Sequence, residues 1–208
     1  MMTAKNKLTA LLPMKAHSAR VKSKNFRLIA GKPLFQWILD ARVLIRDRKP
    51  EICGDFVSMN LILADDIANV PSDHYLMTHT TNPLLQPETI ETMIDVYLKG
   101  VDAGTADSLF TVNKMHTRFY TETGEPINHD PGNLIRTQDL PPYMEENSVS
   151  YLFSPESFAS TQARIGRKPI LFPTPKLESV DIDEISDWFI AESLLMRVAA
   201  GEKLPEEA

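Results

Sequence analysis

Residues 8–34 read LTALLPMKAHSARVKSKNFRLIAGKPL, and this stretch decides the fold class. The apolar segment 8–14 is typical of a buried β-strand, and the polar loop 15–25 follows it directly. Gly31-Lys32-Pro33 then predicts the start of a helix that runs to about Arg42, because proline suits the first turn of a helix. A buried strand, a loop and a helix in this order indicate the first unit of an α/β sheet.

Strand and helix signals alternate along the rest of the chain, which predicts an α/β sheet covered by helices on both faces. Residues 118–128, with Thr123-Gly124-Glu125 at their centre, predict a hairpin inside an insertion over about residues 114–148. The other expected strands are 74–78, 108–112, 149–153 and one that ends at 180–183. The other expected helices are 57–68, 87–98, 155–160 and 185–199.

Length and composition exclude several classes of protein. The 208 residues, 43% of them hydrophobic, suit one globular domain over residues 1–208. No apolar run approaches about 18 residues, so we expect no membrane span. A single cysteine, Cys53, excludes a disulfide framework and a cysteine-rich zinc site, and it favours a reducing cytoplasm.

The net charge of −6 hides a basic N-terminal end. Residues 1–39 carry eight basic residues and no Asp or Glu, so the acidic excess lies in the remainder. Such a chain lacks the broad positive surface of a nucleic-acid binder, but it could hold one compact polyanion. It contains neither G-x-G-x-x-G nor G-x-x-x-x-G-K-[ST], so both common glycine-rich phosphate loops are absent.

The first candidate site is the loop after the first strand. Within ten residues it holds four cations, namely Lys15, Arg20, Lys22 and Lys24. Ligands of open α/β sheets bind at such strand exits, and four cations could neutralise a triphosphate without glycines. The alternative is a solvated basic loop. The lack of acidic residues favours the anion site, because solubilising surfaces usually mix both signs.

The second candidate site is Asp181-Ile182-Asp183. Two carboxylates on one face of a strand repel each other unless a cation lies between them, and Mg²⁺ prefers such hard oxygen ligands. The alternative is that Asp183 caps the final helix, because carboxylates there bind free backbone amides. The residue pattern alone favours the cap.

These segments together resemble the acylneuraminate cytidylyltransferase family. Residues 11–34 are similar, without gaps, to its signature I-P-A-R-x-x-S-K/R-x-x-x-x-K-N followed by L-x-G-K-P-L. Four further segments match in the same order: 48–55 (RKPEICGD), 78–84 (THTTNPL), 147–151 (NSVSY) and 180–187 (VDIDEISD). The resemblance covers nearly the whole chain, from about residue 8 to residue 195.

The resemblance implies a fold and an activity. The fold is a three-layer, mostly parallel, Rossmann-like nucleotidyltransferase sheet with a small hairpin-bearing insertion. The activity is transfer of CMP from CTP to an acidic nonulosonic sugar such as a sialic acid, with release of pyrophosphate and with Mg²⁺ as cofactor. The insertion over residues 114–148 serves relatives as a dimer contact, so a cytoplasmic homodimer is expected, with no nucleic-acid or membrane partner.

The resemblance also assigns roles to residues. Nucleotide binding falls to Lys15, Ser18, Arg20, Lys24, Asn25 and Arg48. Catalysis falls to Lys15, Lys24, Asp181 and Asp183, of which the two aspartates bind the metal. Sugar binding falls to His79, Arg136, Asn147 and Tyr151.

The chain departs from the family pattern in three ways. Lys15 replaces an arginine and loses its bidentate fork, Ala16-His17 replaces two small residues, and His79 replaces a glutamine near the sugar. The family also has a second strand and helix where this chain passes directly from Arg42 to Leu44. Either the sheet lacks them or the sequence as given omits a segment. The second explanation is favoured, because a missing inner strand exposes unpaired backbone.

Two other functions stay open at this point. One is a cytidylyltransferase for 3-deoxy-manno-octulosonate, because Arg20 also suits the S-T-R loop of that relative. The other is a catalytically inactive nucleotide-binding homologue, because of the substitutions in the loop.

Overall fold

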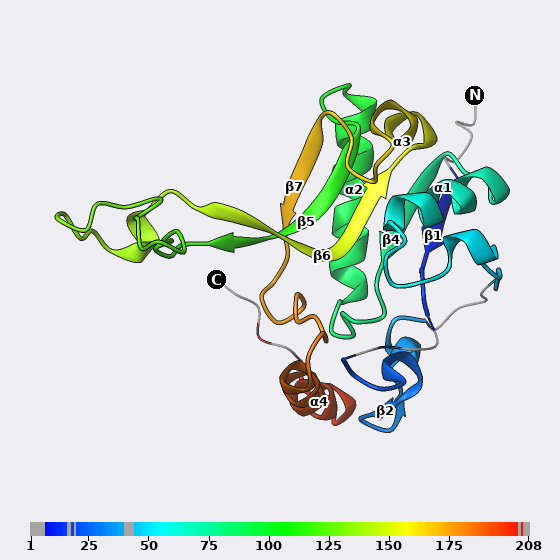
Figure 1. The fold of residues 1–208 in the computed structure, drawn as a ribbon, viewed down its shortest axis with the longest axis horizontal. Helices are drawn as coiled ribbons and strands as arrows, with labels where there is room; N and C mark the ends of the chain where they lie inside the picture. The colour runs from blue at the N-terminus through cyan, green and yellow to red at the C-terminus, as the bar shows by residue number, and fades with distance from the viewer. Residues whose placement is uncertain (1–6, 16–17, 19, 40–43, 204, 206–208) are drawn as a thin grey trace.

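A five-stranded sheet forms the centre of the protein, seen here in a computed structural model (Figure 1). The structure describes residues 7–15, 18, 20–39, 44–203 and 205. The strand order is β1-β4-β6-β5-β7, with β1 parallel to β4, β5 parallel to β7, and β6 antiparallel to both of its neighbours. Four strands therefore share one direction, which confirms a mostly parallel sheet. The strands are β1 Leu8–Leu11, β4 His74–Thr78, β5 Ser108–Met115, β6 Tyr143–Phe153 and β7 Pro169–Pro173.

Helices cover both faces of this sheet, so the expected three layers are confirmed. Side chains alternate along a strand, so Tyr75 and Met77 of β4 pack on one face and Leu76 on the other. The first face is covered by α1 and α3, and the second by α2. The helices are α1 Met59–Asn69, α2 Pro87–Asp102 and α3 Pro155–Thr161.

A separate hydrophobic cluster lies beyond the carboxyl ends of β1 and β4, below the sheet in Figure 1. Helix α4, Ile185–Ala199, has the bounds that the sequence predicts. Its Trp188 packs with Ile29 and Leu34 of a small antiparallel hairpin and its neighbouring turn. That unit consists of β2 Leu28–Ile29, β3 Lys32–Pro33 and the 3₁₀ turn η2 Leu34–Trp37. This cluster joins the start of the chain to its end beneath the sheet.

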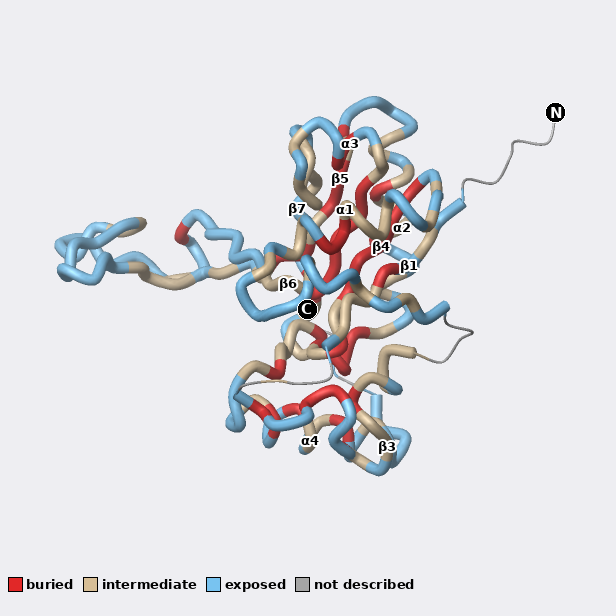
Figure 2. The backbone as a smooth tube through the Cα atoms, turned by 45° about the vertical axis from the view of Figure 1, so that its right-hand side comes forward, coloured by how far each residue is buried: buried red, intermediate tan, exposed pale blue. Residues whose placement is uncertain are grey.

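The predicted insertion projects from the body as an arm (Figures 1 and 2). Strands β5 and β6 continue past the sheet into it, and residues 116–142 form its outer part. The predicted hairpin is confirmed by a bridge between Tyr120 and Pro126, with a turn at Gly124, whose φ is +85°. The arm is largely exposed (Figure 2).

Two predicted elements are wrong. The helix expected to begin at Pro33 is only the 3₁₀ turn η2, and Arg42 lies outside the described residues. The Gly31 turn closes a hairpin instead, and the Trp37 indole donates back to the Ile29 carbonyl at 3.1 Å. Likewise, residues 180–183 form no strand. They are anchored as a loop, in which Ile182 N donates to Thr81 O at 2.9 Å.

β1 is one edge of the sheet that the structure describes. The expectation of a missing inner strand is wrong for the described sheet, because its strands pair without a break from β1 to β7 and a further strand could lie only beyond an edge such as β1. The segment that begins at Leu44 leaves large apolar side chains in solvent: Leu44, Ile45 and Phe56 are all more than three-quarters exposed. An omitted segment at the join therefore stays a prediction.

None of the helices described is long and apolar enough to cross a membrane.

Candidate active site

Asn25 ties together the loops that leave the two neighbouring parallel strands β1 and β4. Its side-chain amide donates to Lys15 O at 2.8 Å, and its amide oxygen accepts from Thr80 Oγ1 at 2.7 Å. Asn25 is buried in the 3₁₀ turn η1, Lys24–Phe26, so both halves of its amide are used inside the protein. The carboxyl ends of β1 and β4 therefore lie together at one edge of the sheet, which is where ligands bind in open α/β sheets.

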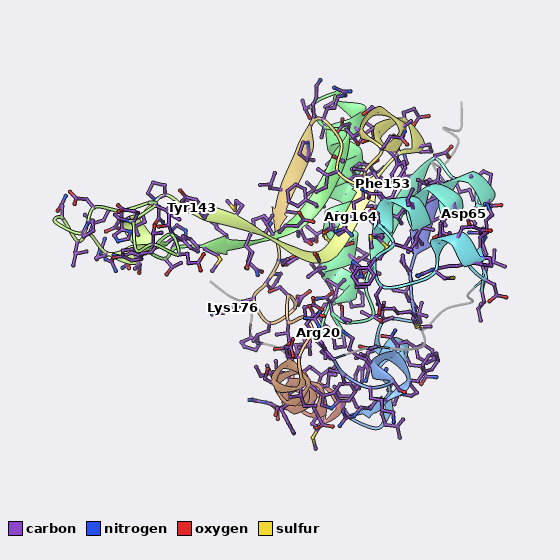
Figure 3. All side chains as sticks on the ribbon, viewed as in Figure 1. Arg20, Asp65, Tyr143, Phe153, Arg164 and Lys176 are labelled. Atoms are coloured by element: carbon purple, nitrogen blue, oxygen red, sulfur yellow. The ribbon has the colours of Figure 1, made fainter. Side chains whose placement is uncertain are left out.

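Two cations near this edge, Arg20 and Lys24, contact the aspartate-containing loop, residues 180–183, that precedes α4. Lys24 is 8% exposed, and its Nζ donates to Ile182 O and lies 3.5 Å from Asp183 Oδ1. Arg20 reaches the same carboxylate at 3.0 Å and Glu184 at 3.2 Å (Figure 3 labels Arg20). The structure therefore brings Arg20 and Lys24 next to Asp183.

Asp181 holds a buried carboxylate that is only partly satisfied. Its Oδ1 is buried and finds no hydrogen-bond partner within the described part of the chain. Burial raises the pKa of Asp181, and the nearby negative charge of Asp183 raises it further, while Lys24 opposes the rise. A buried acceptor oxygen beside a second carboxylate is an environment that a divalent cation would relieve.

The capping interpretation of Asp183 is wrong. The N-cap of α4 is Glu184, which forms a capping box with Asp187. Asp187 Oδ2 accepts from the backbone N–H of Asp183 at 3.0 Å and of Glu184 at 2.7 Å. Neither Asp181 nor Asp183 therefore uses its carboxylate to cap α4.

The residues present fit Mg²⁺ better than a metal with an all-protein cage. Asp181 and Asp183 supply two carboxylates, and magnesium commonly binds one or two of these together with waters and substrate phosphates. The described residues contain no group of three or more His, Cys, Asp and Glu side chains able to hold a metal ion. A site completed by a bound triphosphate is consistent with both observations.

The other residues predicted to bind the nucleotide form no ion pair or hydrogen bond with Asp181 or Asp183 in the part of the chain that the structure describes; they are Lys15, Ser18 and Arg48. Lys15 forms an exposed ion pair with Asp55, which draws the 48–55 segment towards the loop. Exposed pairs contribute little stability, so Lys15 can exchange this partner for a phosphate. Ser18 is half-buried in the loop. Burial raises the pKa of Asp66 on α1, and the positive charge of Arg48 is among the causes that oppose this rise.

His79, directly after β4, is neutral and carries a free ring nitrogen. Its Nε2 is buried and has no hydrogen-bond partner within the described residues. Burial lowers its pKa from 6.5 to about 4, and the positive charges of Arg164 and Lys24 contribute. His79 is therefore close enough to Lys24 and to Arg164 for the charges of both to act on it.

Asn147 and Tyr151 lie on β6 where the strand leaves the body for the arm. The pairing with β5 is irregular there, and Ser148 takes a left-handed φ of +59° at the position where the family signature has glycine. The Asn147 amide donates to Thr174 Oγ1 at 2.7 Å. Tyr151 is fully buried, its hydroxyl donates to Glu146, and burial raises its pKa to about 12.

An arginine that is not among the predicted site residues lies beside Tyr151, whereas Arg136 lies on the arm. The Arg164 guanidinium lies 3.7 Å from the centre of the Tyr151 ring, although the sequence offers only a lone arginine in a loop. Arg136 instead lies on the arm and forms bonds of 2.7 and 2.9 Å with Asp139. Within one chain, Arg136 is therefore not brought to the other predicted residues.

Replacing His79 by glutamine should reduce the loss of stability in acid. A histidine kept neutral by burial stabilises the fold above its unfolded pKa of 6.5, and this stabilisation is lost as the pH falls towards the folded pKa of about 4. His79→Gln should therefore lose roughly 2 kcal/mol less unfolding free energy than the natural chain between neutral pH and about pH 4.5. Urea denaturation at both pH values measures this difference, and equal losses would contradict it.

Comparison with known proteins confirms the family resemblance. No family model matches the chain. The chain is 24% identical over 234 residues to N-acylneuraminate cytidylyltransferase A of Danio rerio, covering 96% of this chain and 53% of the relative. It is 25% identical over 236 residues to CMP-N,N'-diacetyllegionaminic acid synthase of Legionella pneumophila, covering 91% and 96% respectively.

The lengths of these matches carry further information. The chain spans about half the length of the fish relatives that it matches, the second being N-acylneuraminate cytidylyltransferase of Oncorhynchus mykiss at 24% identity, 93% of this chain and 51% of the relative. The 234-residue and 236-residue matches are longer than the 208-residue chain, so each includes positions with no counterpart here. Such gaps fit the absence of the family's second strand and helix from this sequence.

Solved structures confirm the fold. CMP:2-keto-3-deoxy-manno-octonic acid synthetase complexed with CTP is similar, with a TM-score of 0.61 at 14% identity over 92% of this chain and 99% of that chain. The 2-C-methyl-D-erythritol 4-phosphate cytidylyltransferase of Thermus thermophilus has a TM-score of 0.55 at 11% identity over 91% and 98%. The chain thus shares the mixed α/β fold of these structures, with the mostly parallel central sheet that the sequence predicts.

Proposed function

We propose that this protein transfers CMP from CTP to an acidic nonulosonic sugar of the sialic-acid type and releases pyrophosphate. The observation that carries the proposal is the meeting of Arg20 and Lys24, from the β1 exit loop, with the carboxylate of Asp183. A triphosphate seated on this loop would lie beside the half-satisfied Asp181. The relatives named for sialic and legionaminic acids support this sugar class.

The nucleotide half of the site works by charge. The triphosphate oxygens would bind Lys15, Arg20 and Lys24. Ser18 and Asn25 belong to the same nucleotide-binding loop. Arg48 would contact the cytosine. Asp181 and Asp183 would hold Mg²⁺, which when bound neutralises charge on the phosphates. Arg20 and Lys24 already neutralise Asp183, so they can pass to the phosphates as the metal takes their place.

The sugar half of the site works by positioning. The anomeric hydroxyl of the sugar would attack the α-phosphorus, forming a new oxygen–phosphorus bond while the bond to pyrophosphate breaks. Neutral His79 offers its free ring nitrogen to the sugar, and Asn147 and Tyr151 stand on the rigid β6. Holding the two reactants in line accounts for much of the acceleration in such transfers.

The arm suits the homodimer that the resemblance implies. Large apolar side chains are exposed along it and at its base, and they would be covered by a second copy of the chain. They are Tyr120, Ile127, Leu134, Ile135, Tyr143 and Met144. We propose that the arm is the dimer contact of a cytoplasmic enzyme, and sedimentation of the whole chain as a monomer would contradict the dimer.

Pyrophosphate release tests the function directly. The protein is incubated with CTP, Mg²⁺ and one of three acids: N-acetylneuraminic acid, N,N'-diacetyllegionaminic acid or 3-deoxy-manno-octulosonate. We expect release with a nonulosonic acid and none after chelation of the metal. Release with the octulosonate alone would favour the second candidate, which the CTP-bound synthetase structure supports. CTP binding without release from any acid would indicate an inactive homologue.

A further inference from the structure

We propose that Arg164 binds the carboxylate of the acidic sugar and makes this group a requirement for the reaction. The inference rests on the proposed function and assigns a specificity residue within it. Arg164 lies on the loop between α3 and β7. Arg136, which the resemblance suggests for this role, lies on the arm and forms an exposed ion pair with Asp139 of the same chain.

The Arg164 side chain is held in one place by its packing. Its guanidinium carbon is 3.7 Å from the centre of the Tyr151 ring, and the side chain is only 19% exposed. The ring itself is fully buried in the core between the sheet and α1. A planar cation fixed on a rigid aromatic face is already oriented before a ligand arrives.

The Arg164 guanidinium has more N–H donors than it has acceptors among the described residues. Its described partners are one carboxylate oxygen, Glu146 Oε1 at 3.3 Å, and one weak acceptor, Met77 Sδ at 3.6 Å. Arginine carries five N–H donors and prefers two parallel bonds to a carboxylate. The same Glu146 oxygen also accepts from the Tyr151 hydroxyl, so it serves two donors at once. A substrate carboxylate could therefore bind Arg164 without displacing Glu146.

Arg164 also lines a pocket of about 260 Å³. The start of α1 also lines this pocket, and there the Ser58 hydroxyl accepts from the Asn60 backbone N–H at 3.3 Å. The positive end of a helix and a guanidinium face the same space, which favours an anionic occupant. The pocket volume is close to the lower limit of pockets that hold whole small ligands.

The charges around His79 connect this pocket with the nucleotide loop. Arg164 Nη1 lies 3.6 Å from Sδ of Met77, which is two residues before His79 at the end of β4. Burial lowers the pKa of His79, and the positive charges of Arg164 and Lys24 lower it further. Lys24 is engaged by Ile182 and Asp183 on the metal side. An acidic sugar next to His79 would thus have its carboxylate drawn to Arg164 and its anomeric hydroxyl left for the nucleotide.

The test compares a sugar acid with its neutral form. Wild-type and Arg164→Gln proteins are assayed by pyrophosphate release with the best nonulosonic acid and with its C1 carboxamide. For the acid, we expect KM to rise roughly 10- to 100-fold in the variant, the usual worth of a charged hydrogen bond. The KM for CTP and the rate with the carboxamide should stay within about twofold, because neither depends on this charge. Arg164→Lys should recover part of the affinity for the acid.

Matched controls separate the charge from the packing. Arg167→Gln removes an arginine of the same loop, whose Nη2 binds only the Ser160 carbonyl among the residues described, and should leave both KM values unchanged. An equal loss with acid and carboxamide would show that Arg164 merely positions Tyr151, and would overturn the inference while the proposed function stands. If Arg164→Gln does not fold, the Arg164→Lys protein and the wild-type ratio of acid to carboxamide decide, and a ratio near one overturns the inference. No release from wild type with any acid would overturn both.

Discussion

Replacing Asp181 and Asp183 together by asparagine should lower pyrophosphate release by at least about 1,000-fold, because the variant loses both charged ligands for the cation that neutralises the triphosphate. The loss should appear in kcat, since Arg20 and Lys24 remain to bind CTP. Steady-state pyrophosphate release at saturating CTP and sugar acid, over a range of Mg²⁺ concentrations, measures the effect. Excess Mg²⁺ should not restore the rate.

The fold should survive this double change. Burial raises the pKa of Asp181, which means that the folded state disfavours its charge, and asparagine removes that cost. The unfolding free energy should therefore stay within about 1 kcal/mol of wild type. Asp187→Asn is the matched control, because Asp187 caps α4 and asparagine keeps an acceptor there. Full activity in the double variant would exclude this metal site.

Elements with a single strong signal are predicted well from the sequence. Strand β4 and helix α4 have the predicted bounds, because each is marked by apolar residues within its own segment, although the N-cap of α4 is Glu184 and not Asp183. The sequence also predicts the cation-rich loop after β1, because the loop contains no acidic residue with which its lysines and arginine could pair. Such signals lie within a few residues of one another and need no distant partner.

The wrong predictions depend on contacts between distant segments. Leu34, Trp37 and Ile38 have helical spacing, yet Ala30 and Gly31 both take positive φ, at +44° and +89°, and close a hairpin instead. That hairpin is stabilised by packing on α4, more than 150 residues later in the sequence. Arg164 is a comparable case. Nothing in its local sequence shows that the turn after α3 brings it over Tyr151.

Trp188→Ala should destabilise the fold by roughly 3–5 kcal/mol, the usual cost of removing a large buried aromatic side chain. Trp188 is 1% exposed at the centre of the cluster that joins α4 to the β2–β3 hairpin. The guanidinium of Arg27, from the segment that leads into this hairpin, lies 4.4 Å from its ring centre. Urea denaturation measures the loss. Phe189→Ala is the control: this neighbour on the same helix is 63% exposed, so its removal should cost no more than about 0.5 kcal/mol.

The same substitution should weaken the site, because the cluster holds its two halves together. Lys24 and Asn25 precede the hairpin, while Asp181 and Asp183 precede α4, and Trp188 packs between these segments. Loosening them should raise KM for CTP, and saturating CTP with Mg²⁺ should raise the melting temperature of Trp188→Ala, since a ligand stabilises the state it binds. In the Asp181→Asn, Asp183→Asn protein, Mg²⁺ should add nothing to the stabilisation by CTP alone. An additional Mg²⁺-dependent rise there would place the metal on other residues.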